Sequence, residues 1–224
     1  MKLEILYSDN HLLAVNKPVG IATQVSDNNP ESLEEYARMW VKQEFNKPGN
    51  VFLHTVHRLD KPVSGVVLFA KTEKALKRLN ESLREKNAEK IYLAVVKGKL
   101  AAEYGKLIHH HSHGNFKAKI TPNPHKDSKI AILNYERAGK IKEFSLLRIK
   151  LETGRYHQIR AQLAYAGCPI IGDSKYGSTV KCANDEIALH HRSLTFIHPT
   201  LKEKVRVTAN IPNFYPWNLF RETV

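Results

Sequence analysis

Cysteines, long apolar runs and the short motifs of nucleotide or metal sites are scarce or missing in this sequence. Its 224 residues include 2 Cys, 11 Gly and 10 Pro. Cys168 and Cys182 cannot by themselves form a disulfide framework or a four-ligand zinc site, which favours a reducing compartment. The patterns H-E-x-x-H, G-x-x-x-x-G-K-[ST] and G-x-G-x-x-G are absent. We therefore expect no metal and no organic cofactor.

The N-terminal segment, MKLEILYSDNHLLAVNKP, carries acidic side chains and no long apolar run. A secretory signal has a continuous apolar region, and a membrane-spanning helix needs about 20 predominantly apolar residues. Neither pattern is present here. We expect a cytoplasmic protein with no membrane contact.

The chain carries a large excess of positive charge. There are 35 Lys and Arg against 22 Asp and Glu, a formal net charge of +13. Residues 115–160 alone hold 11 basic and 4 acidic side chains. Cations that approach phosphates release condensed counterions, so a polyanion such as RNA is the expected partner. A solvated basic surface that only aids solubility is the alternative.

The composition, 42% hydrophobic and 25% charged, is typical of a globular protein with a packed core. No repeat, low-complexity tract or linker divides the chain, so we expect a single catalytic domain over residues 1–224. Asn29 and Thr72 offer N-caps for two helices. The predicted helices cover residues 30–45, a segment after Thr72, and 155–166. The predicted strands cover 3–7, 12–15, 65–70, 90–97, 129–136, 143–152, 188–197 and 204–210, with an irregular stretch over 98–124. Short strands with few helical crossovers predict the α+β class, with a mixed, mainly antiparallel central sheet flanked by helices.

A run of histidines, HHHSH at 109–113, is the most conspicuous local feature. Adjacent imidazoles can bind a transition metal, so a metal-dependent nuclease is one hypothesis. The run lacks carboxylate or cysteine partners at the usual spacing, which favours a solvated loop or a phosphate-facing patch.

Asp60 lies among His57, Arg58 and Lys61, directly before the apolar run 65–70. Positive neighbours favour the ionised carboxylate, which can act as a nucleophile, a general base or a metal ligand. An ordinary Asp-Lys-Pro turn is the structural alternative.

Several segments resemble one known family. His57–Gly65, H-R-L-D-K-P-V-S-G, closely resembles the H-R-L-D-x-x-T-S-G signature of RluA-type pseudouridine synthases. Other segments match family motifs in order: K-P-V-G at 17–20, K-I-Y-L-A at 90–94, T-G-R-Y-H-Q-I-R at 153–160, P-I-I-G-D at 169–173 and L-H at 189–190. The chain is identified as a member, with the catalytic domain only and no N-terminal S4-type RNA-binding domain. Val63 departs from the signature, because it replaces the usual Thr and removes one hydroxyl.

The resemblance implies a central mixed sheet with an active-site cleft and an enzyme, an isomerase, that converts uridine in RNA to pseudouridine without a cofactor. The glycosidic bond breaks, the uracil turns, and C5 rejoins the ribose carbon. The substrate would be a stem-loop of rRNA or tRNA, in which an unpaired uridine is cheaper to extrude. We expect a monomer.

The resemblance also implies roles for individual residues. Asp60 is the essential carboxylate, which attacks the sugar, adds to the base or removes a sugar proton. Arg160 is its ion-pair partner, because a guanidinium stays charged and offers a rigid fork. Tyr92 stacks beneath the flipped uracil, the alternative being a core tyrosine.

The remaining predicted site residues contact RNA. Arg58 enters the gap left by the extruded nucleotide. His57 belongs to the same RNA-binding loop and shapes it, as Ser64 does, by hydrogen bonding. Arg155 and His157 contact phosphate or brace the helix. A non-catalytic RNA-binding protein or RNA chaperone on the same scaffold is the alternative function.

Overall fold

The computed structural model describes residues 1–25, 31–98, 100–182 and 186–223. The chain divides into two compact units, each of which is described by itself. Unit 1 comprises Met1–Glu89 and His191–Asn210, and unit 2 comprises Lys90–His190 and Ile211–Val224. In the described part of the chain, no helix has the length and apolar character that a membrane crossing needs.

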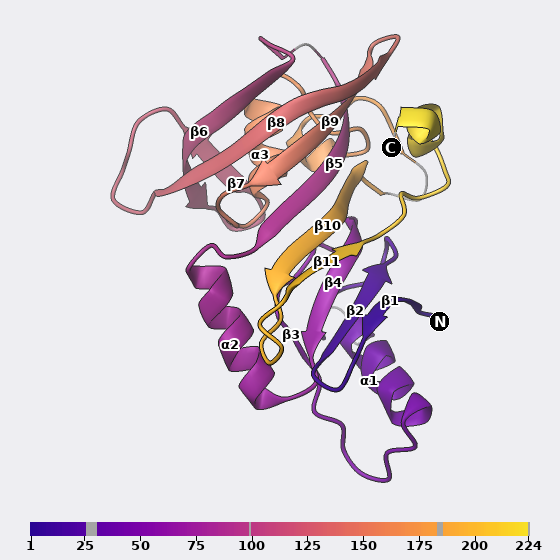
Figure 1. Ribbon diagram of the computed structural model, residues 1–224. Helices are drawn as coiled ribbons and strands as arrows, with labels where there is room; N and C mark the ends of the chain where they lie inside the picture. Colours follow the sequence, from indigo (N-terminus) through magenta and orange to yellow (C-terminus); the bar gives the residue numbers. More distant parts are fainter. Residues whose placement is uncertain (26–30, 99, 183–185, 224) are drawn as a thin grey trace. The chain divides into compact units, whose positions relative to one another are not determined.

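Unit 1 consists of β-strands and two helices (Figure 1). Its strands follow the order β1-β2-β4-β10, with β11 paired to β10 and β3 to β4. The strand bounds are β1 (Glu4–Ser8), β2 (Leu12–Lys17), β3 (His54–Thr55), β4 (Ser64–Ala70), β10 (Leu189–Ile197) and β11 (Lys204–Thr208), and the helices are α1 (Leu33–Glu44) and α2 (Glu73–Arg84).

The core of unit 1 forms where the apolar strand β4 meets β2, β10 and α2. Every residue of β4 is buried, as its continuous apolar sequence predicts. Leu68 of β4, Leu79 of α2 and Leu194 of β10 belong to one hydrophobic cluster. The Thr72 hydroxyl accepts the Ala75 N–H at 3.2 Å, so the predicted cap of α2 is confirmed.

Helix α1 is shorter than predicted. Ser32 caps it by accepting the Glu35 N–H at 3.3 Å, whereas the predicted cap, Asn29, lies outside the described residues. The apolar side chains at helical spacing, Leu33, Ala37 and Val41, are buried as expected.

The strands of unit 2 follow the order β5-β9-β8-β6-β7. Its elements are β5 (Glu89–Lys97), β6 (Tyr104–His113), β7 (Ala118–Thr121), β8 (Lys129–Ile141), β9 (Phe144–Leu151), helix α3 (Gln158–Tyr165) and short 3₁₀ helices at Ser174–Tyr176 and Trp217–Thr223. The pairs β1–β2, β2–β4, β3–β4, β10–β11, β5–β9, β8–β9, β6–β8 and β6–β7 run antiparallel, whereas the neighbours β4 and β10 run in the same direction (Figure 1). The α+β class with a mainly antiparallel sheet flanked by helices is therefore confirmed.

The prediction of an irregular stretch over 98–124 is wrong, because this stretch contains β6 and β7. Strand β6 has a weak local signal, since histidines fill positions that β-branched residues usually take. Pairing with β8 stabilises β6 where the local sequence favours a strand only weakly. Residues 104–111 pair with residues 136–129 in continuous register. The histidine run, residues 109–113, therefore lies within β6 and not on a loop.

Helix α3 begins later than the predicted residue 155. His157 has φ 51° and ψ 25°, the left-handed region, so the right-handed helix cannot extend back through it. Six consecutive residues from Gln158 to Leu163 are buried, so the helix is enclosed on all sides.

Candidate functional site

Asp60 stands at the start of a tight turn that leads into β4. The Val63 N–H donates to the Asp60 carbonyl oxygen at 3.0 Å, which closes the Asp60 turn, residues 60–63. The Val63 side chain is buried, so the methyl that replaces the family's hydroxyl packs in the core. The turn keeps its shape through the backbone and does not need that hydroxyl.

Lys17, the last residue of β2, is hydrogen-bonded to the main chain of the Asp60 turn. It is 0% exposed, and its Nζ donates to the carbonyl oxygens of Pro18, Ile21 and Lys61 at 2.9, 2.8 and 3.1 Å. The Gly20 N–H donates to the same Lys61 oxygen at 3.0 Å. The three carbonyl oxygens match the three N–H donors of an ammonium group. Burial lowers the pKa of Lys17 to about 7, and the negative charge of Asp60 acts against this shift.

Thr23 fixes the residue on the other side of Asp60. Its hydroxyl donates to the Leu59 carbonyl oxygen at 2.8 Å and accepts the Leu59 N–H at 3.1 Å. The main chain is thus hydrogen-bonded both immediately before and immediately after Asp60.

His57 is tied to the strand that follows the turn. Its Nε2 and the Nδ1 of His191 lie 3.1 and 2.7 Å from the Val66 carbonyl oxygen, so both nitrogens carry a hydrogen. Gly65, with φ +115°, lies against the backbone of His191, where a β-carbon would collide with the main chain. Arg58 is exposed, as an RNA-contacting side chain must be.

Tyr92 lies on β5 of unit 2, in register with Ile149 of β9. Its side chain is 8% exposed. Its place in the middle of a paired strand gives it a fixed direction, and its role under a flipped base stays a prediction.

The α3 segment is fixed by a buried glutamine. The Gln158 Oε1 accepts the Thr153 hydroxyl at 2.8 Å and the Arg155 N–H at 3.0 Å, while Nε2 donates to the Ile132 carbonyl oxygen at 3.1 Å. Arg155 is exposed, and its Nε donates to the Ile130 carbonyl oxygen at 3.2 Å. The T-G-R-x-H-Q segment thus forms a turn that is held against β8.

Arg160 is a buried cation at 5% exposure, with a buried partner of its own. Its Nε and Nη2 donate to Oδ2 and Oδ1 of Asp173 at 2.7 and 2.8 Å, a two-point ion pair. Its Nη1 lies 3.1 Å from His157 Nε2, and its guanidinium lies 5.1 Å from the centre of the Tyr176 ring. We call Arg160, Asp173, His157 and Tyr176 the Arg160 cluster.

Asp60 belongs to unit 1, whereas Tyr92 and Arg160 belong to unit 2. The pairing of Asp60 with Arg160 therefore stays a prediction. Lys17, Asp173 and Tyr176 were missed as site residues, although K-P-V-G and P-I-I-G-D had been matched as motifs. A charged residue inside such a motif, close to a predicted site, is the signal that could have found Lys17 and Asp173.

The histidine run does not gather metal ligands. In the described residues there is no group of three or more His, Cys, Asp and Glu side chains placed to hold a metal ion. His111 Nε2 contacts the Tyr156 carbonyl oxygen at 2.7 Å, and His109 Nδ1 lies 3.0 Å from Gln162 Nε2. These two side chains bind the α3 segment to β6.

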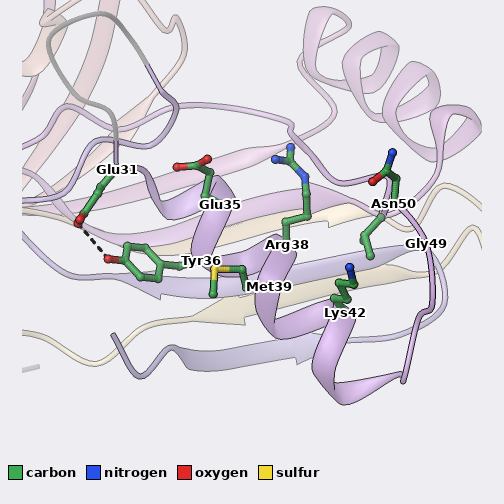
Figure 2. Close-up of a pocket in the computed structure, with 9 residues that line it drawn as sticks. Glu31, Glu35, Tyr36, Arg38, Met39, Lys42, Gly49 and Asn50 are labelled. Carbon is green, nitrogen blue, oxygen red and sulfur yellow. Dashed lines mark hydrogen bonds between the residues drawn. The ribbon is translucent and has the colours of Figure 1, made fainter.

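Two pockets lie away from these residues. One, of about 360 Å³, lies on α1 in unit 1 (Figure 2). Its lining mixes Glu31, Glu35, Arg38 and Lys42 with Tyr36 and Met39, and the Tyr36 hydroxyl donates to Glu31 at 3.0 Å. The other, of about 370 Å³, lies at one end of β5, β8 and β9 in unit 2. None of the predicted site residues lines either pocket.

The chain is similar to a family of known proteins. Residues 11–165 match the family model described as RNA pseudouridylate synthase. The ribosomal large subunit pseudouridine synthase D of Xanthomonas campestris is 32% identical over 94% of this chain, and the chain spans 66% of that relative. The tRNA pseudouridine synthase C of Haemophilus ducreyi is 30% identical over 93% of this chain and 91% of its own length. The solved structure of human RNA pseudouridylate synthase domain containing 4 has the same fold, with a TM-score of 0.81 at 22% identity over 97% of this chain and 92% of that chain.

Proposed function

The chain belongs to the RNA pseudouridylate synthase family, and we propose that it isomerises uridine in RNA to pseudouridine with Asp60 as the essential carboxylate. The Asp60 turn carries this proposal. It presents the carboxylate of the family signature on a main chain fixed by Thr23 and Lys17. A carboxylate that does chemistry must be held in place, because a small displacement of a reacting group costs much of its rate.

The reaction balances without a co-reactant. The N1–C1′ bond breaks, the uracil turns, a C5–C1′ bond forms, and the C5 proton leaves while N1 gains one. Asp60 attacks C1′, adds to the base or removes a sugar proton. Each alternative needs the ionised carboxylate, and none needs a metal or an organic cofactor.

Arg160 and Tyr92 complete the proposed catalytic set. Arg160 is a buried guanidinium that stays charged and is held in one place by Asp173 and His157. A fixed positive charge favours the ionised form of a carboxylate beside it, which supports Arg160 as the partner of Asp60. Tyr92, on a rigid strand, offers an aromatic face on which an extruded uracil can stack.

RNA is captured by the basic surface of the chain. Arg58 and Arg155 are exposed, and we place them, together with His57 and His157, along the RNA. The relatives act on ribosomal large subunit RNA and on tRNA by their names, and we propose a stem-loop of one of these RNAs as substrate.

We place the enzyme in the cytoplasm, acting as a monomer. The chain has only two cysteines, too few for a disulfide framework, which is consistent with a reducing compartment. Light scattering coupled to gel filtration tests the monomer, and a dimer mass would overturn it.

The test measures tritium release from RNA labelled at C5 of uridine. Total RNA from a strain lacking this protein carries unmodified target sites. The RNA is incubated, in the presence of a chelator, with the wild-type protein, with Asp60→Asn or with the control Asp127→Asn. The Asp127 side chain is exposed and lies outside the Asp60 turn and the Arg160 cluster. We expect release by the wild type and the control and none by Asp60→Asn.

Other outcomes overturn the proposal in distinct ways. Turnover by Asp60→Asn equal to that of the wild type would refute the role of Asp60. RNA binding without release by the wild type would favour the non-catalytic RNA-binding alternative. RNA cleavage that the chelator abolishes would favour a metal-dependent nuclease.

A further inference from the structure

His157 contacts the guanidinium of Arg160, the proposed ion-pair partner of Asp60. A neutral imidazole can make only one kind of hydrogen bond with an arginine, in which the imidazole accepts. A guanidinium only donates hydrogen bonds, so His157 Nε2, 3.1 Å from Arg160 Nη1, has to accept. A nitrogen that accepts carries no hydrogen. In the neutral ring the hydrogen is therefore on Nδ1.

Tyr176 stabilises this tautomer. Its hydroxyl oxygen lies 3.0 Å from His157 Nδ1 and accepts the Ala118 N–H at 2.7 Å. An oxygen that receives both hydrogens uses its two lone pairs. The Ala118 amide at the start of β7 thus fixes the Tyr176 oxygen, which accepts the Nδ1 hydrogen that the Arg160 contact requires.

Stacking sets the plane of the His157 ring. The Tyr156 ring lies 3.8 Å from it, centre to centre, at an interplanar angle of 18°. Tyr156 is itself covered by His113, with the ring centres 4.5 Å apart. The left-handed backbone at His157, which costs a non-glycine residue some strain, directs the imidazole to this place.

We propose that His157 is a positioning residue for Arg160: it aims the guanidinium by accepting a hydrogen bond at Nε2, and Tyr176 holds it in the Nδ1–H tautomer. This inference rests on the proposed function, in which Arg160 pairs with Asp60. It gives Arg160 a second hydrogen-bond partner beside Asp173. Asp173 neutralises the charge and fixes one edge of the guanidinium, and His157 fixes Nη1. Protonation of His157 would turn the acceptor into a donor against Arg160.

In the described part of the chain, the charged and titratable groups near the His157 ring include Arg160 and Tyr176 in direct hydrogen-bond contact, Tyr156 in the stack, and Asp173 and His113 one contact further out. The pair of Arg160 and Asp173 is nearly neutral as a whole, so the hydrogen-bond geometry and not net charge decides which form of His157 fits.

The experiment compares three substitutions that separate the two nitrogens from the backbone. His157→Gln places an acceptor at the distance of Nε2, His157→Asn places one only at the distance of Nδ1, and His157→Leu has neither. Asn tolerates the left-handed backbone best, whereas Gln and Leu bear similar strain. If only the backbone conformation at His157 matters, the kcat of His157→Asn should be nearest to that of the wild type. If the Nε2 acceptor matters, the kcat of His157→Gln should be nearest.

We expect kcat for tritium release to fall about tenfold or more in His157→Leu and His157→Asn, the loss expected for one hydrogen bond to a charged group. His157→Gln should recover part of kcat, whereas KM should be similar in the three variants, because each of them removes the imidazole and any contact that it makes with RNA. The wild-type pH profile of kcat should have an acid limb that His157→Gln lacks. A kcat of His157→Leu equal to the wild type, or Asn above Gln, would overturn the proposal.

A readout without catalysis separates this inference from the proposed function. Nitrogen-15 NMR of the wild type at neutral pH should show His157 as the Nδ1–H tautomer, and Tyr176→Phe should shift it toward the other tautomer. An Nε2–H tautomer in the folded wild type overturns the inference even if the enzyme is active. A wild type that releases no tritium but shows the Nδ1–H form overturns the proposed function and leaves the hydrogen-bond arrangement standing.

Discussion

The Asp60 turn and the Arg160 cluster hold their charged groups by opposite means. Asp60 is held through the main chain of its neighbours, by the Thr23 hydroxyl on Leu59 and the Lys17 ammonium on Lys61. Arg160 is held by side chains on its own guanidinium, from Asp173 and His157. The Asp60 side chain can therefore be replaced while the hydrogen bonds that hold its main chain remain. Replacement of Arg160 or of one of its partners breaks the hydrogen bonds that hold the guanidinium.

The largest effect is expected from Asp173→Asn. Removing one partner of a buried ion pair leaves an uncompensated charge, so the free energy of unfolding should fall by about 3 kcal/mol. Urea unfolding followed by circular dichroism measures it, with Asp127→Asn at an exposed site as the control. A loss within 1 kcal/mol of the control would mean that Arg160 does not depend on Asp173, and the comparison would fail.

Lys17→Met comes next. Three carbonyl oxygens beneath the turn lose their donor, and the free energy of unfolding should fall by about 2 kcal/mol. The turnover number should fall too, because Lys61 is no longer fixed beside Asp60. Lys77→Met on the exposed face of α2 is the matched control. Unchanged stability together with unchanged turnover would show that the turn holds itself.

Thr23→Val tests the other side of Asp60. Valine keeps the shape and removes one hydroxyl that makes two hydrogen bonds, so about 1 kcal/mol of stability should be lost. Thr179→Val, at an exposed site, serves as the control. Equal denaturation midpoints for the two variants would contradict a role for Thr23 in fixing Leu59.

The pH dependence of stability sharpens the same comparison. The pKa of Lys17 is lowered from 10.5 in the unfolded chain to about 7 in the folded one. Between these values the unfolded chain binds a proton that the folded chain does not, so this group makes stability rise with pH from about 7 to 10.5. Denaturation at several pH values should show a steeper rise for the wild type than for Lys17→Met. Parallel curves would mean that Lys17 titrates normally in the fold.

Local signals in the sequence account for the elements that were predicted correctly. Strand β4 follows from a continuous apolar run, and α2 from Thr72 and a leucine stripe. Strand β6 could not be predicted in this way, because its partner, β8, begins more than a dozen residues further along the chain.

For the candidate site, the sequence motifs point to single residues, whose roles stay predictions. Asp60 and Arg160 lie in signatures that the sequence displays. The Lys17 contacts were not predictable, because a lysine is almost always exposed and only the fold encloses this one. The Arg160–Asp173 pair joins a helix to a loop across the Gly167 turn, and no helical or strand period links the two positions.

The close approach of Gly65 to His191 has a consequence for how the protein is made. Unit 1 needs residues 191–210, which the ribosome adds after nearly all of unit 2. Strand β4 cannot meet β10, nor His191 the Val66 carbonyl, until that late segment has emerged. During synthesis, the contact of His191 with the strand that follows the Asp60 turn therefore forms only after Tyr92 and Arg160 have been translated, and no nascent fragment ending before His191 can contain it.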